Sequence, residues 1–95
     1  MITGKQRAHL RSLANGIPAI LQIGKGGIND NFLKQVDDAL EARELVKVTI
    51  LETAFLDTKA TCGQVAELLG AEPVQAIGSK FALYRESKDN KTIEI

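Results

Sequence analysis

Residues 19–32 read Ala-Ile-Leu-Gln-Ile-Gly-Lys-Gly-Gly-Ile-Asn-Asp-Asn-Phe. The apolar run from Ala19 to Ile23 has the length of a buried strand. Gly24-Lys25-Gly26-Gly27 interrupts that run, and Asn29 or Asp30 can then cap a helix. The stretch therefore predicts a strand, a glycine loop and a helix in direct succession.

A second helix is expected before this stretch. Thr3 and Gln6 have the spacing of a capping box, in which each side chain bonds the backbone amide of the other residue. The apolar spacing then predicts a helix that runs to Ala14 and buries Leu10, Leu13 and Ala14. Asn15-Gly16-Ile17-Pro18 provides the stop signals.

After the stretch, apolar and polar residues alternate from Leu45 to Leu51, which is the clearest strand pattern in the chain. Asp57 or Thr58 can cap a third helix that ends at Gly70. Gly63 inside that helix predicts an irregular or broken first turn. The residues expected on its buried face are Val65, Leu68 and Leu69.

Two strands are expected near the end, from Pro73 to Ile77 and from Lys80 to Arg85. Gly78-Ser79 between them is a two-residue hairpin loop, and Thr92 to Ile95 could add a weak edge strand. Strands joined through a helix run parallel, so the two crossovers predict a parallel core to which the hairpin adds an antiparallel neighbour. The predicted fold is α/β, a two-layer sandwich of order α-β-α-β-α-β-β with a mixed four-stranded sheet and the glycine loop at a carboxyl edge.

Composition narrows the class of protein. The chain has 95 residues, 44% of them hydrophobic, which predicts one folded domain spanning residues 1–95. Cys62 is the single cysteine, so no internal disulfide can form and a reducing compartment is expected. We expect no signal peptide and no membrane span, and hence a cytoplasmic protein.

The net charge of zero conceals an uneven distribution. Residues 1–28 contain Lys5, Arg7, Arg11 and Lys25 and no acid, whereas the remainder holds 8 basic and 12 acidic residues. Such asymmetry suggests one surface that faces a polyanion and another that is solvated. Arg7 and Arg11 lie one helical turn apart, so they form either a phosphate-binding flank or an ordinary solvated one.

The glycine loop allows close approach of the backbone to a ligand, because no Cβ intervenes. Its amides, together with those of the next helix start, could form a nest for phosphate, and Lys25 adds a positive charge. The spacing is not that of a nucleotide-binding P-loop, and Asn29 occupies the place of the third glycine of a dinucleotide motif. A G-x-x-G loop between strand and helix can clamp an RNA backbone, but a tight turn with a solvated lysine fits the loop equally well.

Other reactive side chains suggest no catalysis. His9 has no second ligand beside it, and Cys62 has no identifiable helper histidine, which favours a core role. Arg85 could extend an RNA surface or pair with a carboxylate. We expect no metal, cofactor or small-molecule substrate, and the acids of the second helix look like a solvated face: Asp37, Asp38, Glu41 and Glu44.

Four segments together resemble the CRM domain, named for chloroplast RNA splicing and ribosome maturation. They are T-G-K-Q-R-A-H-L-R-S-L-A at 3–14, I-L-Q-I-G-K-G-G-I-N-D-N-F at 20–32, E-L-V-K-V-T-I-L at 44–51 and A-E-P-V-Q-A-I-G-S-K-F-A-L-Y-R-E-S at 71–87. The chain is most similar to the small bacterial YhbY-like form. The likeness covers nearly all of the chain in order, and the glycine loop and the final strand pair are its most specific parts.

The resemblance implies a fold like the C-terminal domain of bacterial translation initiation factor three. It also implies RNA binding and association with precursors of the large ribosomal subunit, by a protein that we expect to be a monomer. The alternative is a protein-interaction module of a ribosome-associated complex, suggested by the acidic second helix. The family's RNA-contacting positions correspond here to Gly24, Lys25, Gly26 and Gly27, with Lys5, Arg7 and Arg11 as their expected neighbours.

Overall fold

The computed structural model describes residues 2–95, and the order of its elements agrees with the sequence pattern. The elements are α1 (Gly4–Ala14), β1 (Leu21–Ile23), α2 (Asp30–Arg43), β2 (Leu45–Ile50), the 3-10 helix η1 (Glu52–Ala54), α3 (Thr58–Leu69), β3 (Glu72–Ile77) and β4 (Lys80–Tyr84). None of the helices in residues 2–95 combines the length and apolar character needed to cross a bilayer.

Side-chain caps fix where the three α-helices begin. Thr3 and Gln6 form the predicted capping box at the start of α1. The Asn29 side chain accepts a hydrogen bond from the amide of Phe32, and Asp57 caps α3 in the same way. Each cap satisfies an amide that the helix itself leaves free, so these short polar residues determine where the preceding loops end.

The sheet has the strand order β1-β2-β4-β3. β1 pairs parallel with β2, whereas β4 pairs antiparallel with both β2 and β3. The expected parallel core is therefore wrong in one respect. β3 runs in the same direction as β2, but β4 lies between them, so only the first crossover joins two neighbouring strands. The hairpin folds back into the middle of the sheet instead of extending its edge.

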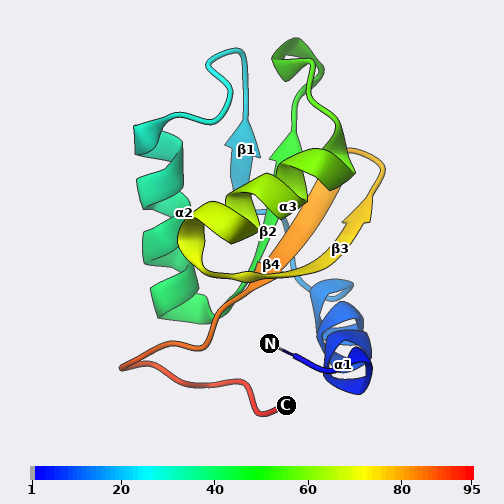
Figure 1. Cartoon of the computed structure of the whole chain (residues 1–95), viewed down its shortest axis with the longest axis vertical. Coiled ribbons are helices and arrows are strands. Elements are labelled where there is room, and N and C mark those ends of the chain that lie inside the picture. Colours follow the sequence, from blue (N-terminus) through cyan, green and yellow to red (C-terminus); the bar gives the residue numbers. More distant parts are fainter. Residues whose placement is uncertain (1) are drawn as a thin grey trace.

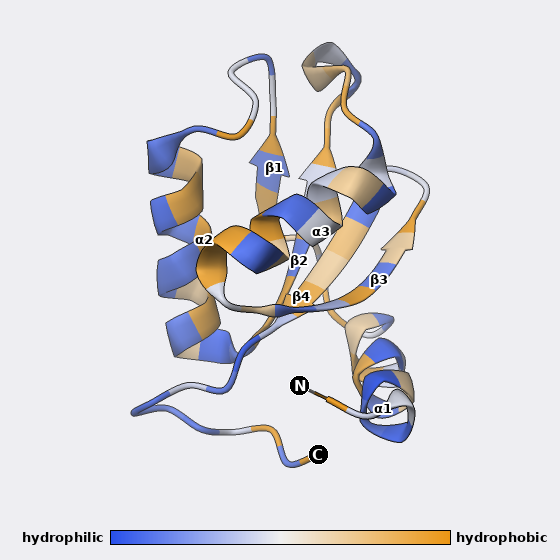
Figure 2. Cartoon of the chain, viewed as in Figure 1, coloured by the Kyte–Doolittle hydropathy of each residue, from blue (hydrophilic) through white to orange (hydrophobic). Residues whose placement is uncertain are grey.

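Each face of the sheet is covered by different helices (Figure 1). On one face, α2 and α3 pack against the sheet through Val36, Leu40 and Val65, which meet Val48 and Phe81. On the opposite face, α1 covers part of the sheet through Leu10 and Ala14 in a second, smaller cluster. The apolar residues are concentrated on the inward sides of the helices, as Figure 2 shows. The α/β sandwich is confirmed, and α1 adds a partial layer behind it.

Some predicted details are wrong. Leu13 is 36% exposed and Leu68 is 56% exposed, because α1 and α3 each bury a narrower stripe than their apolar residues suggest. Gly63 does not interrupt α3, which is continuous from Thr58 to Leu69. Residues 92–95 form no edge strand.

The C-terminal residues instead pack onto a buried carboxylate, that of Glu44. This side chain is fully buried at the turn between α2 and β2. Its oxygens accept hydrogen bonds from the backbone amides of Ser87 (2.8 Å), Thr92 (2.6 Å) and Ile93 (2.8 Å). Burial raises the pKa of Glu44, but these hydrogen bonds outweigh it, and the pKa lies below its ordinary value of 4.5.

Replacing Glu44 with Gln should lower the free energy of unfolding at neutral pH by about 1–3 kcal/mol, because an amide nitrogen then faces backbone donors. The lowered pKa means that the folded state gains from the charged form above pH 4.5 and loses this gain as the pH falls further. The difference between wild type and variant should therefore shrink in acid. Urea denaturation measured at several pH values tests both statements, with Glu67→Gln on the exposed face of α3 as the control.

Two glycines should respond to alanine in opposite directions. Gly63 lies in the middle of α3, and a Cβ there would meet nothing within 4 Å. Gly63→Ala should therefore raise the free energy of unfolding by about 0.5–1 kcal/mol. Gly27, which ends the loop after β1, has a φ of +66°, so Gly27→Ala should lower it by about 1 kcal/mol. Equal effects of the two changes in thermal or urea denaturation would contradict this assignment.

Candidate nucleic-acid interface

The glycine loop projects from the carboxyl edge of the sheet (Figure 1). β1 ends at Ile23, whose carbonyl accepts a hydrogen bond from the amide of Leu51 at 2.9 Å. Beyond it, the chain reverses in a tight turn closed by the Gly27 amide, which donates to the carbonyl of Gly24 at 2.9 Å. The loop is therefore a defined turn held against the end of β2.

Within residues 2–95, the tip of this turn offers hydrogen-bond donors that the protein does not use. The backbone amides of Lys25 and Gly26 make no hydrogen bond to the described part of the chain. The Lys25 side chain is exposed and forms no ion pair with any described residue. The Gly27 amide, in contrast, donates to Gly24 within the turn, so it is not available to the anion-binding nest predicted from the sequence. Two free amides and one ammonium group remain for an oxyanion.

Both helices on this face of the sheet direct their N-termini to the same edge. α2 follows the glycine loop, so the positive end of its dipole lies beside the loop, whereas Thr58 at the start of α3 donates to the carbonyl of Gly78 in the β3–β4 turn. The first amides of α2 are only partly satisfied by Asn29, which takes the amide of Phe32. Asp30 lies in the first turn of α2 and offsets part of the positive potential there.

The structure does not bring the basic residues of α1 to the glycine loop. Arg7 donates to the carbonyl of Pro73 at 3.1 Å and approaches Glu72 at 4.0 Å. Glu72 lies level with Leu45, the first residue of β2, whereas the loop lies beyond its last residue. Five strand residues span about 16 Å. α1 also packs on the opposite face of the sheet, so the expected neighbourhood of Lys5, Arg7 and Arg11 with the loop is wrong.

A basic residue that the sequence did not single out lies nearer to the loop. Lys80 is exposed at the start of β4 and pairs with Thr49 of β2, which pairs in turn with Gln22 of β1. These three side chains alternate with core residues, so they lie on the face that α1 leaves partly open. The sequence alone could not show this, because the insertion of β4 beside β2 is a property of the strand order.

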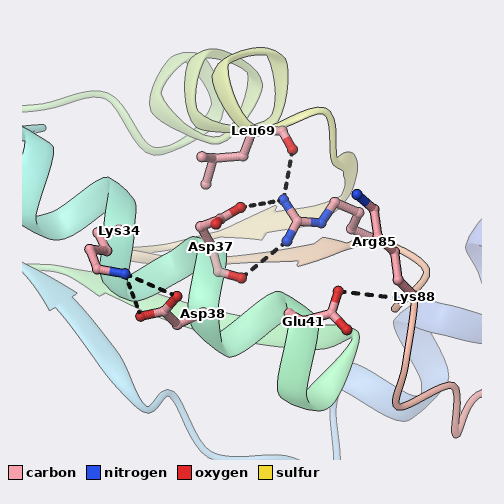
Figure 3. A network of polar contacts seen from close by, with 7 residues as sticks. All are labelled: Lys34, Asp37, Asp38, Glu41, Leu69, Arg85 and Lys88. Atoms are coloured by element: carbon pink, nitrogen blue, oxygen red, sulfur yellow. Dashed lines mark hydrogen bonds and ion pairs between the residues drawn. The ribbon is translucent and has the colours of Figure 1, made fainter.

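The acidic face of α2 has structural partners (Figure 3). Arg85 donates to the Asp37 carboxylate at 2.6 Å and to the carbonyl of Leu69 at 3.0 Å. Carboxylate pairing, one of the two roles considered for Arg85, is therefore the one observed. The hydroxyl of Ser87 and the backbone amides of Asp89 and Lys88 donate to Glu41 and lower its pKa.

The solvated-face prediction thus fails for the buried Glu44 and holds for Asp38, which forms only an exposed pair with Lys34. Asp37 and Glu41 are partly exposed but are engaged by Arg85 and by the C-terminal segment. These partners lie more than 40 residues further along the chain, so no local pattern could indicate them. No described group of three or more His, Cys, Asp and Glu side chains is arranged to hold a metal ion.

Cys62 is buried in the larger core cluster, as predicted. Burial raises the pKa of its thiol to about 11, so the thiolate required of a nucleophile is scarce at neutral pH. His9 is exposed on α1. Neither side chain contributes to the carboxyl edge where the glycine loop lies.

Comparison with known proteins gives this geometry a context. Residues 2–85 match the CRS1/YhbY (CRM) domain family. Probable RNA-binding protein YqeI of Bacillus subtilis is 46% identical over 95 residues, covering 100% of this chain and 99% of the relative. A protein of Haemophilus influenzae named RNA-binding protein is 27% identical over 90 residues, which cover 95% of this chain and 91% of that protein.

A solved structure shares the fold over the whole length. The solution structure of the hypothetical protein SAV1595 from Staphylococcus aureus superimposes with a TM-score of 0.84 at 55% sequence identity, covering 100% of this chain and 99% of that one. The family match spans the four segments that resembled the CRM domain, except for residues 86 and 87 at the end of the fourth segment. The chain belongs to the CRS1/YhbY (CRM) domain family.

Proposed function

We propose that this protein binds RNA through the loop Gly24-Lys25-Gly26-Gly27 and assists assembly of the large ribosomal subunit. The observation that carries the proposal is a projecting turn where, among residues 2–95, the amides of Lys25 and Gly26 make no hydrogen bond and the exposed Lys25 side chain forms no ion pair. An RNA phosphate can accept hydrogen bonds from both amides while the ammonium group neutralises its charge. The names of the relatives support RNA as the partner.

The contact that this geometry favours is with backbone rather than with base edges. Two amides and a lysine recognise a phosphate whatever the sequence attached to it. Gly26 has no Cβ to block this close approach. A Cβ there would also crowd the Asn29 side chain that caps α2, from which it would lie 3.2 Å away. Lys80 lies at the same end of the sheet and can meet a neighbouring phosphate.

Lys5 and Arg11 are exposed on α1, at a distance from the loop. In this proposal they contact a separate segment of a longer RNA. Arg7 is already engaged with Pro73 and Glu72, so we assign it first to holding α1 against β3. A short oligonucleotide that reaches only the loop should therefore be insensitive to changes in α1.

Lys25→Ala should weaken binding to a single-stranded RNA oligonucleotide at least about tenfold, because a charge-assisted contact is lost. The slope of log K against log salt should become shallower by about 0.7, the contribution of one phosphate on a single strand. Fluorescence polarisation at several salt concentrations measures both. Lys88→Ala removes another exposed lysine, in the C-terminal segment, and should change neither. Similar effects of the two variants would contradict a contact specific to the loop.

The ribosomal role can be tested separately by sedimentation of a low-salt lysate through a sucrose gradient. The wild-type protein should travel with precursors of the large subunit, and Lys25→Glu should remain near the top. If both travel together, particle association runs through another surface. Wild-type protein that stays at the top would contradict the ribosomal role, whereas the polarisation measurement would still decide RNA binding.

A further inference from the structure

One aromatic side chain lies at the surface, in contrast to the other three. The sequence contains three phenylalanines, one tyrosine and no tryptophan. Phe32, Phe81 and Tyr84 are at most 6% exposed, whereas Phe55 is 93% exposed. A fully exposed Phe adds nothing to the core, so its position calls for a role outside the fold.

Phe55 belongs to a connection that starts beside the glycine loop. It follows η1 in the connection between β2 and α3, and this connection begins at Leu51. The Leu51 amide donates to Ile23 at the base of the glycine loop, and its side chain lies 3.7 Å from where a Cβ of Gly24 would be. The two connections project side by side from the carboxyl edge of the sheet in Figure 1.

The backbone holds Phe55 outward. Its φ and ψ are 52° and 44°, the left-handed conformation that glycine adopts easily and a bulky residue rarely does. The Phe55 amide donates to the carbonyl of Glu52, which closes η1 and fixes the backbone from which the exposed ring projects. Residues kept in this conformation cluster at binding sites, where the fixed geometry serves recognition.

We propose that Phe55 is a stacking platform for an unpaired RNA base adjacent to the phosphate held by the glycine loop. This inference rests on the proposed function and names its ligand class, a single-stranded segment. A base in a duplex has both faces covered by its neighbours, so only an unpaired base can lie on the ring. Glu52 precedes Phe55 in the same connection and repels a phosphate there, which leaves the phosphate to Lys25 and the base to Phe55.

A protein partner is the competing occupant, since Leu51 and Leu56 beside Phe55 are 36% and 37% exposed. RNA is favoured because the adjoining loop presents free amides and an ammonium group, which suit an oxyanion better than an apolar protein surface. An apolar side chain that serves only to bind a protein would not need these hydrogen-bond donors nearby.

The absence of tryptophan from the sequence allows a direct test. Phe55→Trp keeps a flat ring and introduces a single tryptophan, whose fluorescence a stacked base quenches. Leu68→Trp places the same probe on the exposed side of α3 near its far end and serves as the matched control. A single-stranded RNA oligonucleotide should quench Phe55→Trp and not Leu68→Trp, and a duplex of the same sequence should quench neither.

Affinity gives a second measurement. Phe55→Ala should weaken binding of the single strand at least about fivefold, while Phe55→Trp retains wild-type affinity. The ring is almost fully exposed, so its removal leaves the core intact, and circular dichroism verifies this. Unchanged affinity of Phe55→Ala alongside weakened binding by Lys25→Ala would overturn the stacking site and leave the proposed function standing.

Two further results would also count against the inference. If wild type binds no RNA, both the proposed function and the stacking site fail. If Phe55→Ala binds RNA as wild type does but leaves ribosomal particles in the sucrose gradient, Phe55 docks on a protein.

Discussion

The parallel pairing of β1 with β2 is the constraint on which the rest of the structure depends. It brings Ile23 and Ile50 level at one end of the sheet, and the amide of Leu51 extends the pairing by one further hydrogen bond. The two connections that leave these strands must therefore start side by side. Because each leads into a helix on the same face, the glycine loop, Phe55 and two helix N-termini share one edge.

Local signals in the sequence were sufficient for the three α-helices, their caps and the four strands of the sheet, but not for η1. Thr3, Asn29 and Asp57 each bond an amide within three residues, an interaction set by spacing alone. The strand order was not accessible in the same way. Whether β4 lies at an edge or beside β2 depends on side-chain packing between segments more than 30 residues apart, and the hairpin pattern is identical in both arrangements.

In the candidate site too, the local features could be predicted from the sequence and the contacts between distant segments could not. The glycine loop and Lys25 could be identified from the sequence, because a turn between a strand and a capped helix is a local structure. The association of Arg7 with that loop was inferred from the family resemblance and from the acid-free charge of residues 1–28, and neither specifies a distance. Arg7 lies against Glu72 because α1 packs behind the sheet. The exposure of Phe55 could not be predicted, because a single exposed apolar residue leaves no periodic pattern in the sequence.

The strand order also has a consequence for how the protein emerges during synthesis. β4, the last strand of the sheet in chain order, lies between β2 and β3 and forms the hydrogen bonds that join them. Until the ribosome has released it, β3 has no partner and the larger core lacks Phe81 and Leu83. The four-stranded sheet is therefore completed only when β4 inserts between β2 and β3, late in synthesis. This step depends on contacts between distant parts of the chain.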